Sequence, residues 1–148
     1  MKRSPQSMLG VTLLEIMLVL AIAAMVIVMS IRYYQSASNN QKIAAGLNTI
    51  MAVAAAGESY LATGPAQGLQ TASTLNFTPY LGGVVPTSPW GGPLEIAGIN
   101  ATSYSIDMSV SSDPVVCTQL IALISQNSKL STPAPTCAGG KLKVTVNM

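Results

Sequence analysis

A long apolar run near the N-terminus constrains this chain more than any other feature. Between Val11 and Ile31 the polar residues are Thr12, Glu15 and Ser30. About 20 apolar residues, rising about 1.5 Å each as a helix, span the hydrocarbon core of a bilayer. An acid inside such a helix costs insertion free energy and is by default a functional residue, so Glu15 needs a partner. The alternative is a carboxylate at the membrane interface without a function.

The composition narrows the function further. Charged residues make up 8% of the 148 residues, against about 25% in soluble domains. The net charge of +2 comes from Lys2 and Arg3, because without them five of the seven basic residues remain against five acidic ones. A neutral, charge-poor chain favours self-association over nucleic-acid binding. There is no histidine, the commonest general base and metal ligand, so we expect no enzyme, metal or cofactor.

A candidate cleavage site precedes the apolar run instead of following it. Secretory signals are cut after the hydrophobic region at small residues, and no such site follows the run here. The small residue is Gly10, at the end of a basic leader, residues 1–10, which should stay in the cytoplasm. Cutting after Gly10 would keep the run on the mature chain. It would also place a new amino group on Val11, four residues before Glu15.

The residues around Gly10 resemble the class III leader of type IV pilins and pseudopilins. The match consists of the basic leader, Leu9-Gly10 and the segment Val11-Thr12-Leu13-Leu14-Glu15-Ile16. In that family a prepilin peptidase cuts after the glycine and methylates the new N-terminal residue, which here is Val11. The fifth mature residue is acidic, and here it is Glu15. Most type IVa pilins begin with Phe, so Val11 is more similar to type IVb, although this leader is shorter than many type IVb leaders.

The resemblance implies that Glu15 sets the register between subunits. The Val11 amine would be positive at neutral pH, and a charge left unpaired in an apolar environment is costly. Glu15 of one subunit would meet the Val11 amine of another, with Thr12 hydrogen bonding nearby, so that only the correct axial stagger neutralises both charges. The apolar run would exchange lipid for the same helices of other copies. Small residues that permit close approach are Ala21, Ala23 and Ala24. The alternative is a single-span anchor.

The helix should continue past the membrane. Arg32-Tyr33-Tyr34 suits a membrane interface. Apolar residues then recur at steps of three and four, as on one face of an amphipathic helix. These are Ile43, Leu47, Ile50, Met51, Ala54 and Leu61. Thr63-Gly64-Pro65 is a stop signal. We predict one helix over residues 11–62, with 11–31 as the transmembrane segment or fibre core and 32–62 amphipathic and packed on a head.

The rest of the chain predicts a small α+β head. Residues 63–93 are rich in Gly, Pro, Ser and Thr and indicate a connecting loop, with room for a helical turn near 75–81. Trp90 in this loop is interpreted as a packing anchor between the loop and the sheet, and the alternative is a platform for a ligand. Residues 94–148 should form the β-sheet and disulfide-bonded region. Period-two patterns predict strands at 94–99, 104–110 and 141–146, and Asp113-Pro114 starts a helix to about Gln126.

The two cysteines, Cys117 and Cys137, should form a disulfide if the apolar run exports the rest of the chain to an oxidising compartment. Closing a loop of about 20 residues is worth roughly 3 kcal/mol in the chain-entropy model. The alternative is two unrelated free thiols. The layout also resembles type IVb pilins, in which a helix carrying the first cysteine is tied to a cysteine just before the last strand.

The resemblance implies the pilin fold, a long N-terminal helix packed on a small antiparallel sheet with a second helix and one disulfide. The function that it implies is a structural subunit that polymerises into an extracellular type IV, IVb-like pilus, used for adhesion, aggregation, motility or conjugative contact. Its partners would be other copies, the prepilin peptidase and the assembly platform in the inner membrane. Before assembly the chain would be a single-pass protein of the bacterial inner membrane, with the leader cytoplasmic and the head periplasmic.

Three other functions stay open: a pseudopilin of a type II secretion system, a minor pilin, and a membrane-anchored ligand-binding protein. The disulfide and the lack of a C-terminal Asp-rich calcium loop favour the pilin over the pseudopilin. Lys129, Lys141 and Lys143 are interpreted as solvated positions rather than a DNA site. The glycine pairs match turns and no phosphate-binding loop.

Overall fold

The computed structural model describes residues 12–66, 68–130 and 132–148. The chain divides into two units between Ser38 and Asn39, and helix α1 (Leu13–Ala62) contributes to both. We call the second unit, Asn39–Met148, the head. The residues of the buried core lie between Ile43 and Val146, all within the head. Because it carries its own hydrophobic core, the head meets the condition for folding as an independent domain.

Helix α1 confirms the predicted long helix over the part of the chain that the structure describes. It begins at Leu13, and the predicted start at Val11 lies outside the described residues. The end at Ala62 is as predicted. The chain closes with tighter turns there, since the backbone N–H groups of Thr63 and Gly64 donate to the carbonyls of Tyr60 and Leu61.

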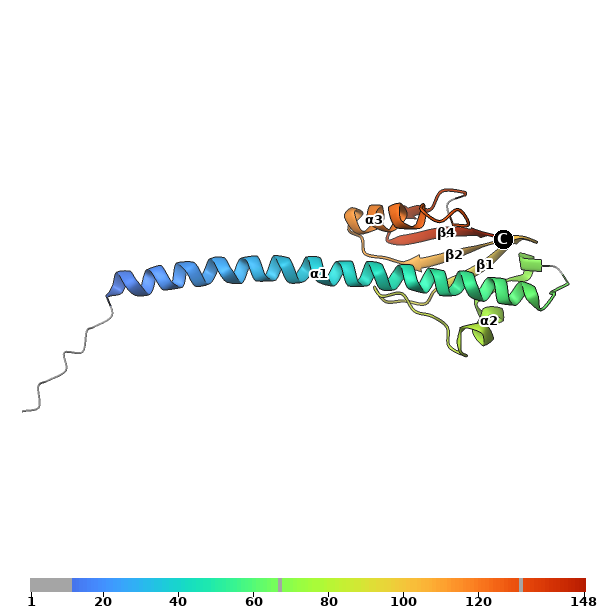
Figure 1. The fold of residues 1–148 in the computed structure, drawn as a ribbon, viewed down its shortest axis with the longest axis horizontal. Helices are drawn as coiled ribbons and strands as arrows, with labels where there is room; N and C mark the ends of the chain where they lie inside the picture. The colour runs from blue at the N-terminus through green and yellow to red at the C-terminus, as the bar shows by residue number, and fades with distance from the viewer. Residues whose placement is uncertain (1–11, 67, 131) are drawn as a thin grey trace, which may run out of the picture. The chain divides into compact units, whose positions relative to one another are not determined.

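The head contains a four-stranded antiparallel sheet with the order β1-β2-β4-β3. Strands β1, β2 and β4 are labelled in Figure 1. The strands are β1 (Glu95–Asn100), β2 (Ser103–Ser109), β3 (Thr136–Ala138) and β4 (Lys141–Asn147). Strands β1, β2 and β4 confirm the predicted strands to within two residues. Strand β3 was not predicted, and it places Cys137 inside the sheet, opposite Leu142. It turns back into β4 through Gly139-Gly140, both with positive φ, as a two-residue hairpin requires.

The two faces of the sheet differ because side chains alternate along each strand. The inner face is buried in the core and is formed by Ile96, Tyr104, Ile106, Met108, Leu142, Val144 and Val146. The second half of α1 and helix α3 (Pro114–Ile124) contribute the facing core residues. The outer face carries the intervening residues, among them Glu95, Asp107, Lys141 and Lys143. The observed architecture is therefore the expected α+β layout.

The face of α1 that packs in the head differs in detail from the predicted stripe. Ile43 and Ile50 are buried as expected, but Met51 is 42% exposed. Gly46 and Gly57 lie in the buried face instead. A Cβ on Gly46 would come within 3.0 Å of the Trp90 ring, so the absence of a side chain lets the indole pack on the helix. Trp90 packs against the core, as a packing anchor should, but the contact seen here is with helix α1, which was not predicted; the glycine positions were missed as well.

The predicted connecting loop contains three short helical segments: η1 (Gly68–Thr71), α2 (Thr74–Phe77) and η2 (Thr78–Leu81). The segment also lies along the free edge of β1. Ser73 forms an antiparallel bridge with Ala97, the Gly98 N–H donates to the Ala72 carbonyl, and the Ile96 N–H donates to Thr74 Oγ1 at 3.0 Å. The loop is thus a part of the head that completes the sheet edge.

Candidate functional site

The N-terminus of α1 is built by Thr12 and Glu15. Thr12 Oγ1 accepts a hydrogen bond from the Glu15 backbone N–H at 3.3 Å, and the Thr12 carbonyl accepts from the N–H groups of Glu15 and Ile16. This is the cap geometry of a Thr-x-x-Glu pattern, in which Thr satisfies a helix donor that has no intrahelical partner. Glu15 lies in the first turn, where the helix dipole favours a negative charge.

Thr12 is therefore a helix-capping residue within its own chain. The sequence predicted only that Thr12 lies near the contact between subunits. Thr12 and Glu15 are both exposed, and they lie one turn apart. Gly10 and Val11, which would carry the predicted cleavage site and the predicted amine, lie outside the described residues. The capping pattern was readable in the sequence, since Thr, two residues and Glu precede an apolar run.

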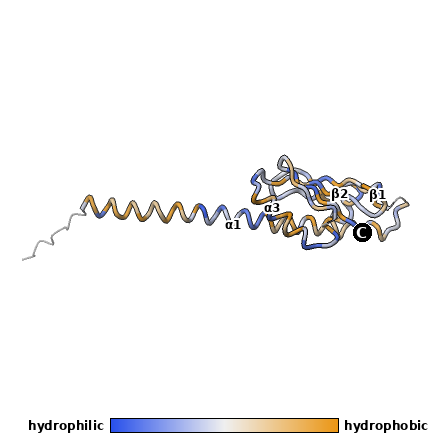
Figure 2. Tube along the Cα trace, turned by 90° about the horizontal axis from the view of Figure 1, so that it is seen from above, coloured by the Kyte–Doolittle hydropathy of each residue, from blue (hydrophilic) through white to orange (hydrophobic). Residues whose placement is uncertain are grey.

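The segment of α1 from Leu13 to Ile31 is apolar and exposed all round (Figure 2). Every large apolar side chain in it is about half exposed or more, from 49% at Ile16 to 78% at Leu13. The hydroxyl of Ser30 donates to the Val26 carbonyl at 2.8 Å, so this polar group is satisfied within the helix. Glu15 remains as the one charged side chain of the segment.

A surface of this kind is unstable in water. Burying one side chain such as Leu, Ile or Met is worth about 1.5–3 kcal/mol, so the segment requires an apolar environment outside its own chain. The helix contains a window long and apolar enough to cross a membrane, with none of it buried. Tyr33 and Tyr34 follow this segment and are 79% and 75% exposed, which fits the aromatic belt of a membrane interface.

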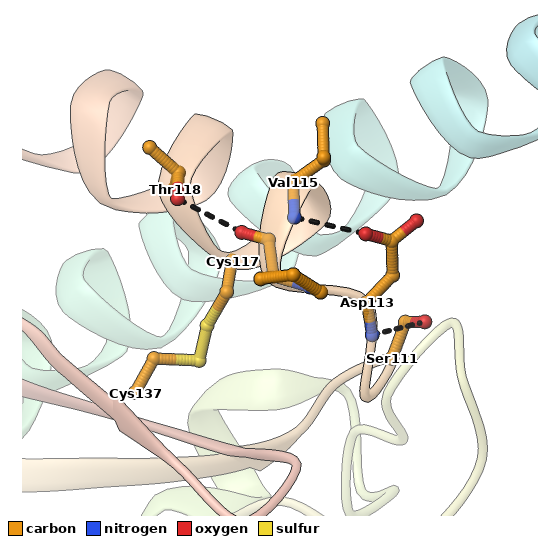
Figure 3. Close-up of a disulfide and its surroundings, with 7 residues drawn as sticks. Ser111, Asp113, Val115, Cys117, Thr118 and Cys137 are labelled. Carbon is orange, nitrogen blue, oxygen red and sulfur yellow. Dashed lines mark hydrogen bonds between the residues drawn. A yellow bond between two sulfur atoms is a disulfide. The ribbon is translucent and has the colours of Figure 1, made fainter.

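The head carries a disulfide between Cys117 on α3 and Cys137 on β3, as expected (Figure 3). The N-terminus of α3 lies beside it: Asp113 Oδ1 accepts from the Val115 N–H at 2.9 Å, and Pro114 takes the first helical position. The predicted helix start is therefore confirmed. The disulfide ties α3 to the short edge strand β3, and the neighbouring residues Val116, Leu120 and Ile124 of α3 are buried in the core.

An apolar groove of about 450 Å³ runs between α1 and α3 in the head. Its walls are formed by Asn40, Ile43, Ala44 and Leu47 of α1 and by Gln119, Ala122 and Leu123 of α3. Leu47 and Leu123 also line a second, more polar depression of about 430 Å³ further along the two helices. The groove has no charged residue in its lining, so it is a surface for apolar contact and holds no group suited to catalysis.

A buried aromatic cluster holds α1 against the sheet. Tyr104 on β2 is fully buried, and its hydroxyl donates to the Val53 carbonyl of α1 at 3.1 Å. Its ring packs edge-on against Phe77 of α2, with 5.1 Å between the centroids, and Phe77 in turn contacts Tyr60. Burial raises the pKa of the Tyr104 hydroxyl well above its ordinary value, and the negative charge of Glu58 raises it further.

Glu58 of α1 forms an ion pair with Lys129, which follows α3. Both side chains are more than half exposed, so the pair contributes little to stability. Together with the buried Tyr104 contact, it joins α1 to segments more than 45 residues away in sequence. These contacts fix the geometry of the head and place no reactive group in a cavity.

The described residues contain no cluster of side chains that could hold a metal ion. No three side chains of the types His, Cys, Asp or Glu come together in residues 12–66, 68–130 and 132–148. Glu95 and Asp107 lie opposite each other on β1 and β2, but they are only two carboxylates. The candidate site is therefore the exposed apolar segment of α1 with Glu15, a surface for lipid or protein contact.

Comparisons with models of protein families, with curated proteins and with solved structures found no match.

Proposed function

We propose that this chain is a pilin, a structural subunit that is cut by a prepilin peptidase and polymerises through α1 into an extracellular fibre. The observation that carries the proposal is the exposed apolar segment Leu13–Ile31 with Glu15 as its one charged residue. Such a segment requires an apolar environment, and lipid and a bundle of identical helices both provide one. The basic leader ending at Gly10 adds the processing signal.

The free energy of assembly supports a polymer that an external motor can both build and take apart. In the membrane the side chains from Leu13 to Ile31 contact lipid, and in a fibre they would contact the same helices of other copies. Lipid chains are about as apolar as these side chains, so the exchange is nearly balanced and an external motor can drive it in either direction. The charge of Glu15 is different, because it is costly in both environments until it is paired.

The pairing partner is the amine of Val11 in a neighbouring subunit. Within one subunit Thr12 already caps the helix through the Glu15 N–H, and this bond leaves the Glu15 carboxylate free for a neighbour. Pairing the two charges fixes how far one helix slides along the next. The disulfide-bonded head agrees with this function, since disulfides persist in the periplasm and outside the cell.

The test is to shear fibres from cells that express the chain and to measure the mass of their subunit. We expect fibres built of a chain that begins at N-methyl-Val11. Gly10→Val should leave the full-length precursor in the membrane, and Glu15→Gln should give a processed, membrane-bound chain that forms few or no fibres. Ser30→Ala is the matched control, because it removes a polar group from the same exposed segment without removing a charge.

Fibres at the wild-type level from Glu15→Gln would show that the charge pair is not needed. A wild-type chain found in the membrane alone would contradict the main-subunit function. If in addition its deletion stopped the export of a folded protein, the chain would be a pseudopilin of a secretion system.

A further inference from the structure

Charged side chains of the head are concentrated on the outer face of the sheet. The head contains the acids Glu58, Glu95, Asp107 and Asp113 and the bases Lys42, Lys129, Lys141 and Lys143. Glu58 and Lys129 pair with each other, and Asp113 caps α3. Of the remaining five, all but Lys42 lie on β1, β2 and β4 with their side chains on the outer face.

These four charges are neighbours but are not paired within the chain. Glu95 is opposite Asp107, and Asp107 is opposite Lys143, so that two acids and a base form one row across three strands. Lys141 lies one step along β4, opposite Ser109. Over the described residues, the ion pair that is present joins Glu58 to Lys129, and the outer-face charges form none. Glu95, Asp107 and Lys141 line a common recess of about 120 Å³.

Most other residues of the outer face have small side chains that project little from the sheet. They include Ala97, Ser105, Ser109, Ala138 and Thr145. Ser105 and Thr145 are 3% and 9% exposed, so they do not stand above their neighbours. The row of charges therefore offers the strongest polar contacts of this face to another molecule.

The strand order makes this face complementary to itself. The acids lie on β1 and β2, the bases lie on β4, and β2 and β4 are the two central strands. Consider a second copy placed face to face with the first by a two-fold axis that runs parallel to the strands, midway between β2 and β4. Strand β2 of each copy then lies over strand β4 of the other. Asp107 of one copy then lies over Lys143 of the other, and the symmetry repeats the contact. A contact of this kind is isologous and closes as a dimer.

We propose that the outer sheet face is a contact between two copies of this chain, held by Asp107 and Lys143 across a two-fold axis. Strands about 4.8 Å apart with about 3.3 Å per residue give a face of roughly 300–400 Å² per copy. This is below the roughly 800 Å² per partner of a stable complex, so the dimer of isolated heads is weak and transient. Attraction between solvated charges makes it dependent on salt.

In a fibre, many copies of the contact would act together. If the chain polymerises as proposed above, each fibre presents an array of identical faces, and weak contacts in an array add up by avidity. The contact would then join fibres side by side. This consequence rests on the proposed function, whereas the dimer of heads does not, so the two can fail separately.

The test uses the head, residues 39–148, which contains the whole core, produced with its disulfide formed. Sedimentation velocity over a concentration series should show dimers at about 20 mM salt and monomers at about 0.5 M salt. Asp107→Lys and Lys143→Asp should each weaken the dimer by at least about tenfold, because two symmetry-related contacts become repulsive. The double exchange Asp107→Lys with Lys143→Asp should restore it.

The control for charge is Lys42→Asp, which changes the net charge as Lys143→Asp does but lies on α1. Circular dichroism checks that each variant is folded. A second measurement detects a weak contact directly: heads of two isotopic labels are mixed and treated with a carbodiimide, which joins a carboxylate to an amine without a spacer. We expect mixed-label peptides that link Asp107 to Lys143.

The proposal is overturned by any of four results. They are monomers and no mixed-label link at low salt, a dimer that the two single exchanges leave unchanged, an equal loss of the dimer in Lys42→Asp, or a double exchange that stays monomeric.

Discussion

Gly57→Ala should destabilise the head even though alanine is the better helix former. A Cβ at this position would lie 2.5 Å from the Tyr104 hydroxyl and 2.9 Å from both Tyr104 Cε1 and Met148 Cε. The contact on Met148 is with the far end of a flexible side chain, but Tyr104 is fully buried, bonded to Val53 and packed on Phe77. The new methyl group must therefore displace the tyrosine ring.

The size of the effect follows from three terms. Overpacking costs about 1–3 kcal/mol. Loss of the Tyr104 hydrogen bond to Val53 adds about 1 kcal/mol. Helix propensity returns about 1 kcal/mol for Gly→Ala. The net loss is about 2 kcal/mol, which lowers the melting temperature of a domain of this size by on the order of 8 °C.

The assay is thermal and urea unfolding of the head followed by circular dichroism, for Gly57→Ala alone and combined with Tyr104→Phe. Removing the hydroxyl removes the closest contact, so Gly57→Ala should cost less in the Tyr104→Phe background. Gly46→Ala is the graded comparison, because its Cβ would meet the half-buried Trp90 ring at 3.0 Å and should cost less. A Gly57→Ala head as stable as the wild type would refute the close-packing explanation.

Three further predictions concern the same domain. Because the pKa of Tyr104 is raised in the folded head, the unfolded chain releases this proton at lower pH than the folded chain. The free energy of unfolding should therefore fall as pH rises above about 10, by up to about 1.4 kcal/mol per pH unit. The variant Tyr104→Phe should lose this slope in thermal melts between about pH 9 and 11. Replacing Cys117 and Cys137 by Ser should cost about 3 kcal/mol, measured against the wild type with and without reductant, and an unchanged midpoint would contradict it. Asp113→Ala should cost about 1 kcal/mol through the lost cap of α3, whereas Asp113→Asn should retain most of the stability.

Features with a local cause could be predicted from the sequence. The start of α3 depends on Asp113 and Pro114 alone, and the end of α1 follows from Thr63-Gly64-Pro65. The long strands β2 and β4 alternate apolar with polar residues, because the apolar side chains all point to the inner face and form the core. The disulfide followed from the expected compartment, since two cysteines in an exported chain pair.

Features set by distant contacts were not predictable in this way. Strand β3 has three residues, too few for a periodic pattern, and exists because β4 pairs with it. The importance of Gly57 in α1 depends on Tyr104, which lies on strand β2, and a glycine in a helix is by itself a weak signal. For Glu15, the local cap pattern with Thr12 could be read, but its pairing partner in another copy remains a prediction.

The edges of the sheet determine whether two heads can join through their strands. On one side, the bridge from Ser73 to Ala97 and the bond from Ile96 to Thr74 occupy part of the backbone of β1. On the other side, β3 is only three residues long and follows Pro133 and Pro135. Blocked or short edges prevent a sheet from templating another strand. Heads of this shape can therefore be crowded against one another, in a membrane or along a filament, without growing into continuous cross-β aggregates.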